Sequence, residues 1–238
     1  MIVIHVDTME DTARLKKTYE GLENVTLLYN PTKEEVVAQL KRDDDPLVMC
    51  LGHGSSSGLF NRDWFGYVVD HSMVDLLKDR KVIGIWCFAS SFAERYGLQG
   101  YFTSMFVSNI NEAEGFGFPD NTNEDILNEV NLFCETINTY LKGGLPMDEW
   151  VPRLQAGCHK EKDFVKYNYE GMRYFEKNRI MLNDDSTSTG KNVINEMARL
   201  NKHDDSQSPF PSNKTTMLGR IGTNQEAAFN EWEACNDD

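Results

Sequence analysis

A histidine and a cysteine each end a short apolar segment, and these two side chains carry most of the chemistry that the sequence offers. Residues 46–54 end in His53-Gly54, and residues 81–87 end in Cys87. If the two segments are neighbouring strands of an open parallel sheet, their carboxyl ends meet at one edge, where such sheets bind ligands. A thiol beside an imidazole is the pair that a cysteine nucleophile and its base require. The pattern therefore predicts that His53 and Cys87 are catalytic.

The residues around the pair offer further groups for such chemistry. The segment Phe88-Ala-Ser-Ser is expected to begin a helix, and a helix amino terminus lowers the pKa of a thiol. The backbone N–H groups of Gly54 and Cys87 are candidates for an oxyanion hole, and Gly54 has no side chain to keep a carbonyl oxygen away. The alternative is that Cys87 is a small buried hydrophobe, as many cysteines are.

The other histidines and cysteines are expected to be structural. His5 lies inside an apolar segment and is expected in the core, whereas polar surroundings predict a surface position for three others: His71, His159 and His203. Three cysteines are expected in the core: Cys50, Cys134 and Cys158. Cys50 and His53 have the spacing of a zinc pair, but a strand is not the tight knuckle that zinc sites use. We expect no metal and no cofactor, and no phosphate-binding glycine loop is present.

Composition limits the possible partners. The chain has 238 residues, 40% of them hydrophobic, and a net charge of −14, which is enough apolar material for one good core. The acidic balance argues against direct binding of nucleic acid and against an anionic membrane surface. No signal-peptide pattern follows Met1, no apolar run is long enough to span a membrane, and the five cysteines show no paired spacing. We therefore expect a soluble cytoplasmic protein with reduced thiols.

Strand and helix patterns alternate along residues 1–182. Strands are expected over residues 2–6, 24–29, 46–53, 81–87, 101–109 and 171–182, with a small hairpin over 57–69. Helices are expected over residues 10–21, 32–40, 72–78, 88–96, 123–142 and 147–168. The alternation predicts an α/β fold, a mostly parallel sheet with helices on both faces.

Residues 183–238 are different in character from the preceding chain. They are rich in Asn, Asp, Ser and Thr and poor in aromatic residues. Such a composition predicts a loosely structured C-terminal tail with short helices. It is either a solvated extension or a segment that docks on a partner or on the domain itself.

The His-Gly and Cys segments together resemble the caspase-like (clan CD) cysteine peptidases, which include caspases, metacaspases, gingipains, clostripain-like enzymes, separase and the CHAT proteins. The resemblance rests on Leu51-Gly-His53-Gly54 and Ile85-Trp-Cys87-Phe-Ala-Ser90, and covers residues 1–182. It implies a caspase-like three-layer sandwich with about six strands, the last one antiparallel. It also implies that Cys87 attacks a peptide carbonyl and that His53 protonates the leaving amine.

The resemblance further implies where the substrate side chain binds. Family pockets draw on the loop after the first strand and on the strand after the cysteine, which gives four substrate-binding candidates: Asp7, Ser108, Asn109 and Glu112. The first of these loops also contains Thr8, Glu10 and Asp11. Acidic residues there favour a basic side chain before the scissile bond. Alternatively, Asp7 and Glu10 cap the following helix.

Two positions near the cysteine complete the comparison with the family. Ile85 stands where members that cut after Arg or Lys carry Asp and where caspases carry Gln. Trp86 and Phe88 flank the cysteine and are expected to be packing residues.

The leading hypothesis is a cytoplasmic cysteine endopeptidase that acts on a protein or peptide substrate. We expect it to be latent until an activating protein partner, a larger effector complex, a ligand, calcium or self-cleavage releases it. Residues 55–58, residues 111–123 and the tail are candidate gates. The alternatives are a non-catalytic caspase-fold module for binding or assembly and a flavodoxin-like binder of small ligands. The acidic loop after the first strand would repel the phosphate of such a ligand.

Overall fold

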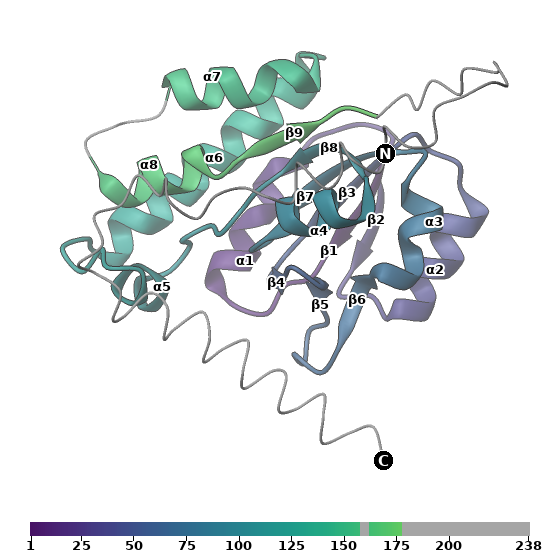
Figure 1. The fold of residues 1–238 in the computed structure, drawn as a ribbon, viewed down its shortest axis with the longest axis horizontal. Helices are drawn as coiled ribbons and strands as arrows, with labels where there is room; N and C mark the ends of the chain where they lie inside the picture. Colours follow the sequence, from purple (N-terminus) through teal and green to yellow (C-terminus); the bar gives the residue numbers. More distant parts are fainter. Residues whose placement is uncertain (158–161, 178–238) are drawn as a thin grey trace, which may run out of the picture. The chain divides into compact units, whose positions relative to one another are not determined.

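A six-stranded, mostly parallel sheet forms the centre of the protein (Figure 1). The computed structural model describes residues 1–157 and 162–177. The strand order is β2-β1-β3-β7-β8-β9, and only β9 runs antiparallel to its neighbour. The strands are β1 (Ile2–His5), β2 (Thr26–Tyr29), β3 (Leu47–Leu51), β7 (Lys81–Ile85), β8 (Gln99–Phe102) and β9 (Arg173–Phe175).

Successive residues of the central strands pack on opposite faces of the sheet, as the pleat requires. Val3, Met49 and Ile83 belong to one apolar core, whereas Ile4, Cys50 and Val82 belong to the other. All four residues of β1 are buried, which is typical of a parallel strand covered on both faces. The prediction of an α/β sheet with two covered faces is confirmed.

Helices cover both faces and form the outer layers of the sandwich (Figure 1). The first core is covered by α1 (Glu10–Arg14), the short 3₁₀ segment Leu15–Thr18, α6 (Asn123–Lys142), α7 (Trp150–Gly157) and α8 (Asp163–Glu170). The second core is covered by α2 (Lys33–Arg42), α3 (Val74–Leu77) and α4 (Ala89–Tyr96). A short helix, α5 (Ile110–Gly115), follows the loop after β8.

The expected hairpin between the two chemistry-bearing segments is a small three-stranded antiparallel sheet. It consists of β4 (Gly54–Ser55), β5 (Gly58–Phe60) and β6 (Tyr67–Asp70). It begins directly after His53, so its geometry decides how the backbone leaves the end of β3. Residues 55–58, a candidate gate, form the β4–β5 turn of this sheet.

Several expected element boundaries were wrong. Residues 103–109 form no strand, and β8 ends at Phe102. The helix expected over residues 10–21 is short, because α1 passes into the 3₁₀ segment at Leu15. The helix expected over residues 147–168 is divided into the 3₁₀ turn Met147–Glu149, α7 and α8. The prediction for the tail, residues 183–238, and those for Cys158, His159 and His203 lie outside the described residues.

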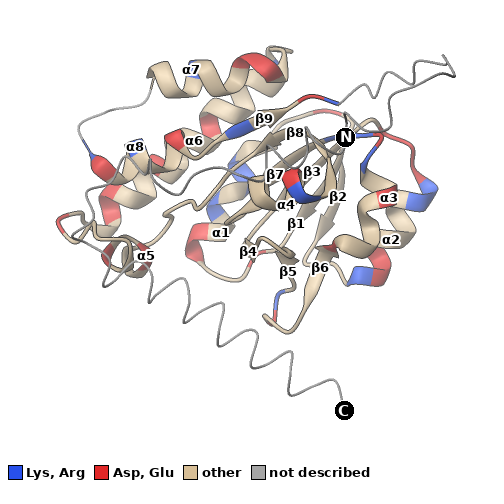
Figure 2. Cartoon of the chain, viewed as in Figure 1, with Lys and Arg blue, Asp and Glu red and all other residues tan. Residues whose placement is uncertain are grey.

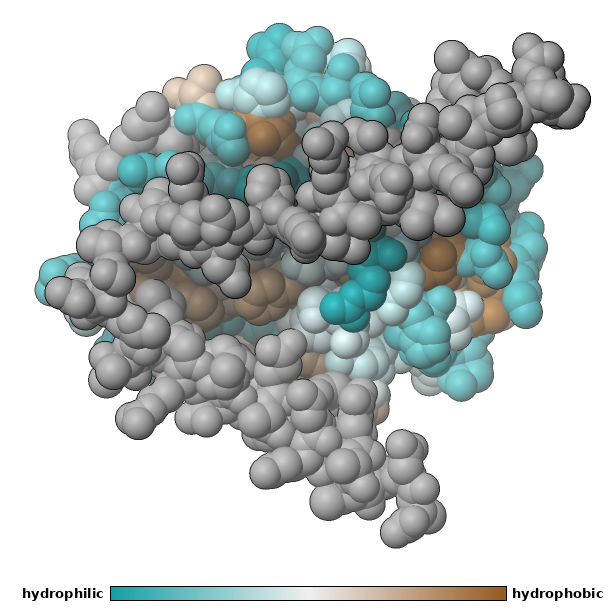
Figure 3. Space-filling model, viewed as in Figure 1, coloured by the Kyte–Doolittle hydropathy of each residue, from teal (hydrophilic) through white to brown (hydrophobic). Residues whose placement is uncertain are grey.

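Charged residues lie mainly on the outer helices and loops (Figure 2), whereas the sheet interior is apolar. On the face drawn in Figure 3, hydrophilic residues surround smaller apolar areas of the described part. Among the described residues, no helix combines the length and apolar character that a bilayer crossing needs.

Candidate active site

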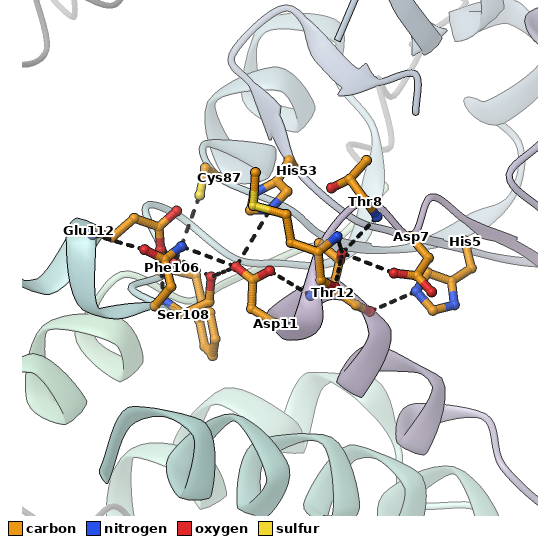
Figure 4. Close-up of polar contacts among 12 residues, drawn as sticks. His5, Asp7, Thr8, Asp11, Thr12, His53, Cys87, Phe106, Ser108 and Glu112 are labelled. Atoms are coloured by element: carbon orange, nitrogen blue, oxygen red, sulfur yellow. Dashed lines mark hydrogen bonds and ion pairs between the residues drawn. The ribbon is translucent and has the colours of Figure 1, made fainter. Parts of the chain in front are cut away.

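The sheet register brings His53 and Cys87 to the same edge. Strands β3 and β7 are parallel neighbours, and Leu51 pairs with Ile85 at the last position of both strands. The Gly52 N–H donates a hydrogen bond to the Ile85 carbonyl (3.2 Å) and ties the two strand ends together. His53 and Cys87 therefore leave the sheet side by side, and both line one small cavity. Figure 4 shows their side chains close together above two acidic residues.

Cys87 sits in a bend between β7 and α4, half-buried, with its Sγ 3.8 Å from the Phe106 carbonyl oxygen. The next residue, Phe88, has a left-handed backbone (φ 65°) and begins α4 as its N-cap. Burial raises the pKa of the Cys87 thiol, and the Glu112 and Asp11 carboxylates raise it further. The expectation that the helix amino terminus lowers this pKa was wrong, because burial and two nearby negative charges outweigh it.

His53 is buried between an acidic cluster and an aromatic ring. Its Nε2 lies 3.5 Å from Asp11 Oδ2, and the ring stacks on Trp64 with a centroid distance of 4.8 Å. Burial lowers the pKa of His53, but the Asp11 and Glu112 carboxylates outweigh it, so the pKa is raised above its ordinary value. The pKa of both groups is therefore raised, which disfavours the Cys87 thiolate.

Ser108 and Asn109 hold the two carboxylates in place. The Ser108 N–H donates to Glu112 Oε2 (2.8 Å), and the single Ser108 hydroxyl proton can be donated either to Asp11 Oδ2 (2.8 Å) or to Glu112 Oε2 (3.0 Å). The Asn109 amide donates to Asp11 Oδ2 (3.1 Å). Hydrogen bonds and His53 lower the pKa of Asp11 to about 2 despite its burial. The pKa of Glu112 is raised, mainly by burial. The four residues thus form a hydrogen-bonded acidic wall against His53.

Two cavities of different size meet at His53. The smaller, about 20 Å³, lies between His53 and Cys87, which is room for about one water molecule. The larger, about 400 Å³, is an open groove that is also lined by His53, together with Met9, Asp11, Trp64, Asn109 and Glu112 among others. The acidic wall therefore faces a groove large enough for a long side chain.

The two expected oxyanion donors have different surroundings. Within the described residues, the Cys87 N–H donates no backbone hydrogen bond. The Phe60 N–H donates to the His53 carbonyl (2.9 Å), and Gly54 lies opposite Leu59. Because opposed residues in an antiparallel pair alternate in hydrogen bonding, the Gly54 N–H points away from β5. Neither N–H group therefore has a backbone acceptor among the described residues.

Gly54 is needed for packing more than for the approach of a carbonyl oxygen. A Cβ at this position would lie 2.2 Å from Trp86 Cδ1 and 2.5 Å from the Gly58 carbonyl oxygen. The Trp86 ring fills the space beside Gly54, and its Nε1 donates to the Ser55 carbonyl (3.1 Å). Trp86 is buried, as expected of a packing residue, whereas Phe88 is 39% exposed and packs only in part.

Asp7 is the one substrate-binding candidate that lines neither of the two cavities. Its carboxylate accepts a hydrogen bond from the Tyr29 hydroxyl, and its N–H donates to Asn30 (2.7 Å). Asp7 is held there, at the end of β2. Ser108, Asn109 and Glu112 do border His53 and the groove, and Asp11 takes the place expected for Asp7.

The remaining predictions for histidine and cysteine are confirmed within the described residues. His5 is fully buried, and its two ring nitrogens contact the Tyr19 hydroxyl and the Thr12 carbonyl, each at 2.8 Å. His71 is exposed. Cys50 and Cys134 are buried core residues. None of these four residues lines the two cavities beside His53.

Sequence reasoning missed two contacts of His53. The first is the ion pair with Asp11, which was only one of several acids in its loop. The second is the stacking of Trp64, whose backbone is left-handed (φ 63°) and whose side chain is 41% exposed. An exposed tryptophan in the polar segment Asn61-Arg-Asp-Trp64-Phe-Gly was the available signal, since large aromatics in polar loops often bind ligands.

No family model matches this sequence, and neither a curated protein nor a solved structure is significantly similar to it. Arguments about function therefore depend on the geometry of the site itself.

Proposed function

We propose that this protein is a cysteine endopeptidase in which Cys87 is the nucleophile and His53 the proton carrier. The observation that carries the proposal is the Leu51–Ile85 pairing, which delivers an imidazole and a thiol to one sheet edge. The caspase-like resemblance of the two segments and the antiparallel sixth strand support the same family. A cytoplasmic setting, with reduced thiols, suits this chemistry.

In the proposed reaction, Cys87 Sγ forms a bond to the peptide carbonyl carbon while the thiol proton passes to neutral His53. The N–H groups of Cys87 and Gly54 stabilise the developing oxyanion. The imidazolium then donates its proton to the amine nitrogen as the C–N bond breaks. Water hydrolyses the resulting thioester and regenerates the thiol.

The acidic wall supports a preference for a basic residue before the scissile bond. Asp11 is ionised because its pKa is about 2, and both Asp11 and Glu112 line the groove of about 400 Å³. An Arg or Lys side chain in this groove would form charge-assisted hydrogen bonds. Ser108 and Asn109 orient the Asp11 carboxylate for that contact.

The resting geometry supports latency. The pKa of the Cys87 thiol is raised, the thiol faces the Phe106 carbonyl at 3.8 Å, and the space between Cys87 and His53 is about 20 Å³. A thiolate forms readily only if this arrangement changes. An activating partner, a ligand or self-cleavage that moves residues 103–112 would supply such a change.

The same raised pKa favours a second candidate, a non-catalytic module of this fold that binds or assembles with another protein. Labelling with peptidyl electrophiles that carry Arg, Lys, Asp, Leu or Ala at the leading position separates the two. The proposal expects labelling of Cys87, strongest with Arg or Lys, and none in Cys87→Ala. A matched control is Cys50→Ala, which should still be labelled.

If no electrophile labels Cys87 although a small alkylating agent does, the chain is either a latent peptidase that awaits its activator or a binding module, and the search moves to partners. Labelling that is equal for all five leading residues would contradict the proposed preference for a basic residue but would still support Cys87 as the nucleophile.

A further inference from the structure

Three potential metal ligands from three separate elements converge at the candidate site. Asp11 belongs to α1, His53 follows β3, and Glu112 belongs to α5. One ligand atom from each lies within 4.8 Å of the other two. Figure 4 shows the Asp11 and Glu112 carboxylates and the His53 ring turned toward a common region. Such a mixture of one imidazole and two carboxylates is a ligand set that zinc accepts.

The His53 Nε2 atom is unsatisfied in this cluster. His53 is 8% exposed, and its buried Nε2 makes no hydrogen bond to any residue in the described part of the chain. Its only close polar contact there is the 3.5 Å approach to Asp11 Oδ2, which is too long for a good hydrogen bond. Buried polar atoms without a partner are rare and indicate a ligand, an ion or a functional role.

The spacing of these atoms is suited to a small cation. In tetrahedral coordination with bonds of about 2.1 Å, neighbouring zinc ligands lie about 3.4 Å apart. The 3.5 Å between His53 Nε2 and Asp11 Oδ2 matches that edge. The Glu112 ligand atom lies within 4.8 Å of the other two, and its Oε1 accepts no hydrogen bond from the described residues that would oppose a closer approach.

The surroundings already orient the carboxylates as outer-shell residues do in metal sites. The Ser108 N–H donates to Glu112, the Ser108 hydroxyl lies within hydrogen-bond distance of both carboxylates, and Asn109 donates to Asp11. Outer-shell hydrogen bonds of this kind fix the direction of metal ligands and tune their affinity. The buried carboxylate of Asp11 and the partly buried carboxylate of Glu112, against one imidazole, are a concentration of acidic groups that a divalent cation would neutralise.

We propose that Asp11, His53 and Glu112 bind one Zn²⁺ ion, and that the bound ion holds His53 away from catalysis. The imidazole ligand favours Zn²⁺ over Ca²⁺ and Mg²⁺, which prefer oxygen ligands. The open groove, lined by all three residues, gives the ion a path of entry and leaves its fourth position to water. Cys87 is not a ligand in this site.

The inhibitory consequence depends on the proposed peptidase function, whereas the binding of zinc does not. The ion would occupy the carboxylates that are proposed to receive a basic side chain. Zinc and a substrate with Arg or Lys before the scissile bond would therefore compete for the site.

Calorimetric titration of ZnCl₂ into metal-free full-length protein tests the site without any need for activity. Titrations in a Cys87→Ala background remove the thiol as a competing ligand. We expect Asp11→Asn and Glu112→Gln to weaken one binding event by at least about tenfold, since outer-shell changes alone cost 10–100-fold. Glu114→Gln, an exposed change on the same helix, is the matched control and should leave that event unchanged.

Thermal unfolding of each variant checks that the fold persists, and a Co²⁺ titration gives a second readout. We expect tetrahedral Co²⁺ absorption bands that disappear in Asp11→Asn and Glu112→Gln. Zinc affinities equal to those of the control, or Co²⁺ bands that persist in both variants, would overturn the proposal. Zinc binding that behaves as expected in a chain that no peptidyl electrophile labels would support the metal site without supporting the peptidase.

Discussion

His53 and Cys87 each lie two residues beyond the final rung of two neighbouring parallel strands, the rung formed by Leu51 and Ile85. The equal offset means that the sheet register alone brings the imidazole and the thiol to the same height on the edge. No long loop has to find the right conformation to join them. A site built directly on strand ends is held more precisely than one built on mobile loops.

Gly54→Ala should destabilise the protein through a clash with Trp86. The new Cβ would lie 2.2 Å from Trp86 Cδ1 and 2.5 Å from the Gly58 carbonyl oxygen, so the ring or the hairpin must move. Overpacking of this kind costs about 1–3 kcal/mol. Denaturant unfolding measures the loss. The control is Gly157→Ala, where a Cβ meets no atom within 4 Å, and a loss of the same size there would contradict the explanation.

Glu112→Gln should speed the alkylation of Cys87 at neutral pH. The Glu112 carboxylate is one of the groups that raise the pKa of the thiol above its ordinary value of 9.0, after burial. Removing this charge lowers the pKa, and a fall of one in pKa increases the thiolate fraction about tenfold. Iodoacetamide rates with mass-spectrometric mapping, in buffer with a chelator, provide the measurement.

In wild type, the alkylation rate should still be rising at pH 9.0, because the thiol is not yet half ionised there. Glu114→Gln is the control, since its side chain is exposed on the same helix. Two outcomes would show that Cys87 is not held as a neutral thiol. One is a wild-type alkylation rate that reaches its plateau below pH 9.0, and the other is an equal alkylation rate in Glu112→Gln and Glu114→Gln.

The main features of this site could be predicted from the sequence, and the reasons are local. The strand ends at His53 and Cys87 are marked by apolar runs, and parallel pairing of such runs follows from the alternation with helices. The capping box of Thr32 and Glu35 correctly marks the start of α2. The apolar stripe of α6, including Ile126, Val130 and Phe133, is buried as its spacing predicts.

The rest depends on contacts between distant segments, which no local pattern encodes. Asp11 and Ser108 are 97 positions apart and are joined by one hydrogen bond. Residues 103–109 have the composition of a strand, but β8 ends at Phe102. Beyond it, Thr103 and Ser104 turn back to accept hydrogen bonds from the backbone of α4. Tertiary contacts override strand propensity in such a segment.

Asp70→Asn should lower stability at neutral pH and lose most of its effect in acid. Asp70 accepts hydrogen bonds from the N–H (2.9 Å) and hydroxyl (2.6 Å) of Ser72, and it pairs with Lys33. These partners outweigh burial and lower the pKa of Asp70 below 3.8. A carboxylate whose pKa is lowered by folding stabilises the folded state at pH values above its pKa in the unfolded chain. That stabilisation is lost as the pH falls through its lower pKa in the folded state.

The expected difference in unfolding free energy between wild type and Asp70→Asn is at most about 1 kcal/mol at pH 7 and smaller at pH 3, because Asn keeps the N-cap acceptor and the change removes mainly the ion pair with Lys33. Asp75→Asn is the control, because its ion pair with Lys78 is exposed and such pairs contribute little. A difference that is the same at both pH values would mean that the charge of Asp70 is irrelevant.

Asn168→Ala should destabilise the loop that carries the acidic wall. The Asn168 side chain accepts a hydrogen bond from the Val107 N–H (2.7 Å) and donates one to the Val107 carbonyl (2.9 Å), and it is 3% exposed. Truncation leaves both backbone groups buried without partners, which costs about 1–3 kcal/mol for each such group. Since Ser108 directly follows Val107, the hydrogen bonds from Ser108 to Asp11 and Glu112 should also weaken.

Hydrogen exchange of the Val107 amide, together with denaturant unfolding, measures both effects of Asn168→Ala. The amide should exchange faster than in wild type by more than global destabilisation explains, because the break is local. Asn128→Ala, an exposed change on α6, should alter neither quantity. If the Val107 amide of Asn168→Ala exchanges no faster than the change in global stability explains, α8 does not anchor the loop. The Ser108 contacts would then have to maintain the acidic wall on their own.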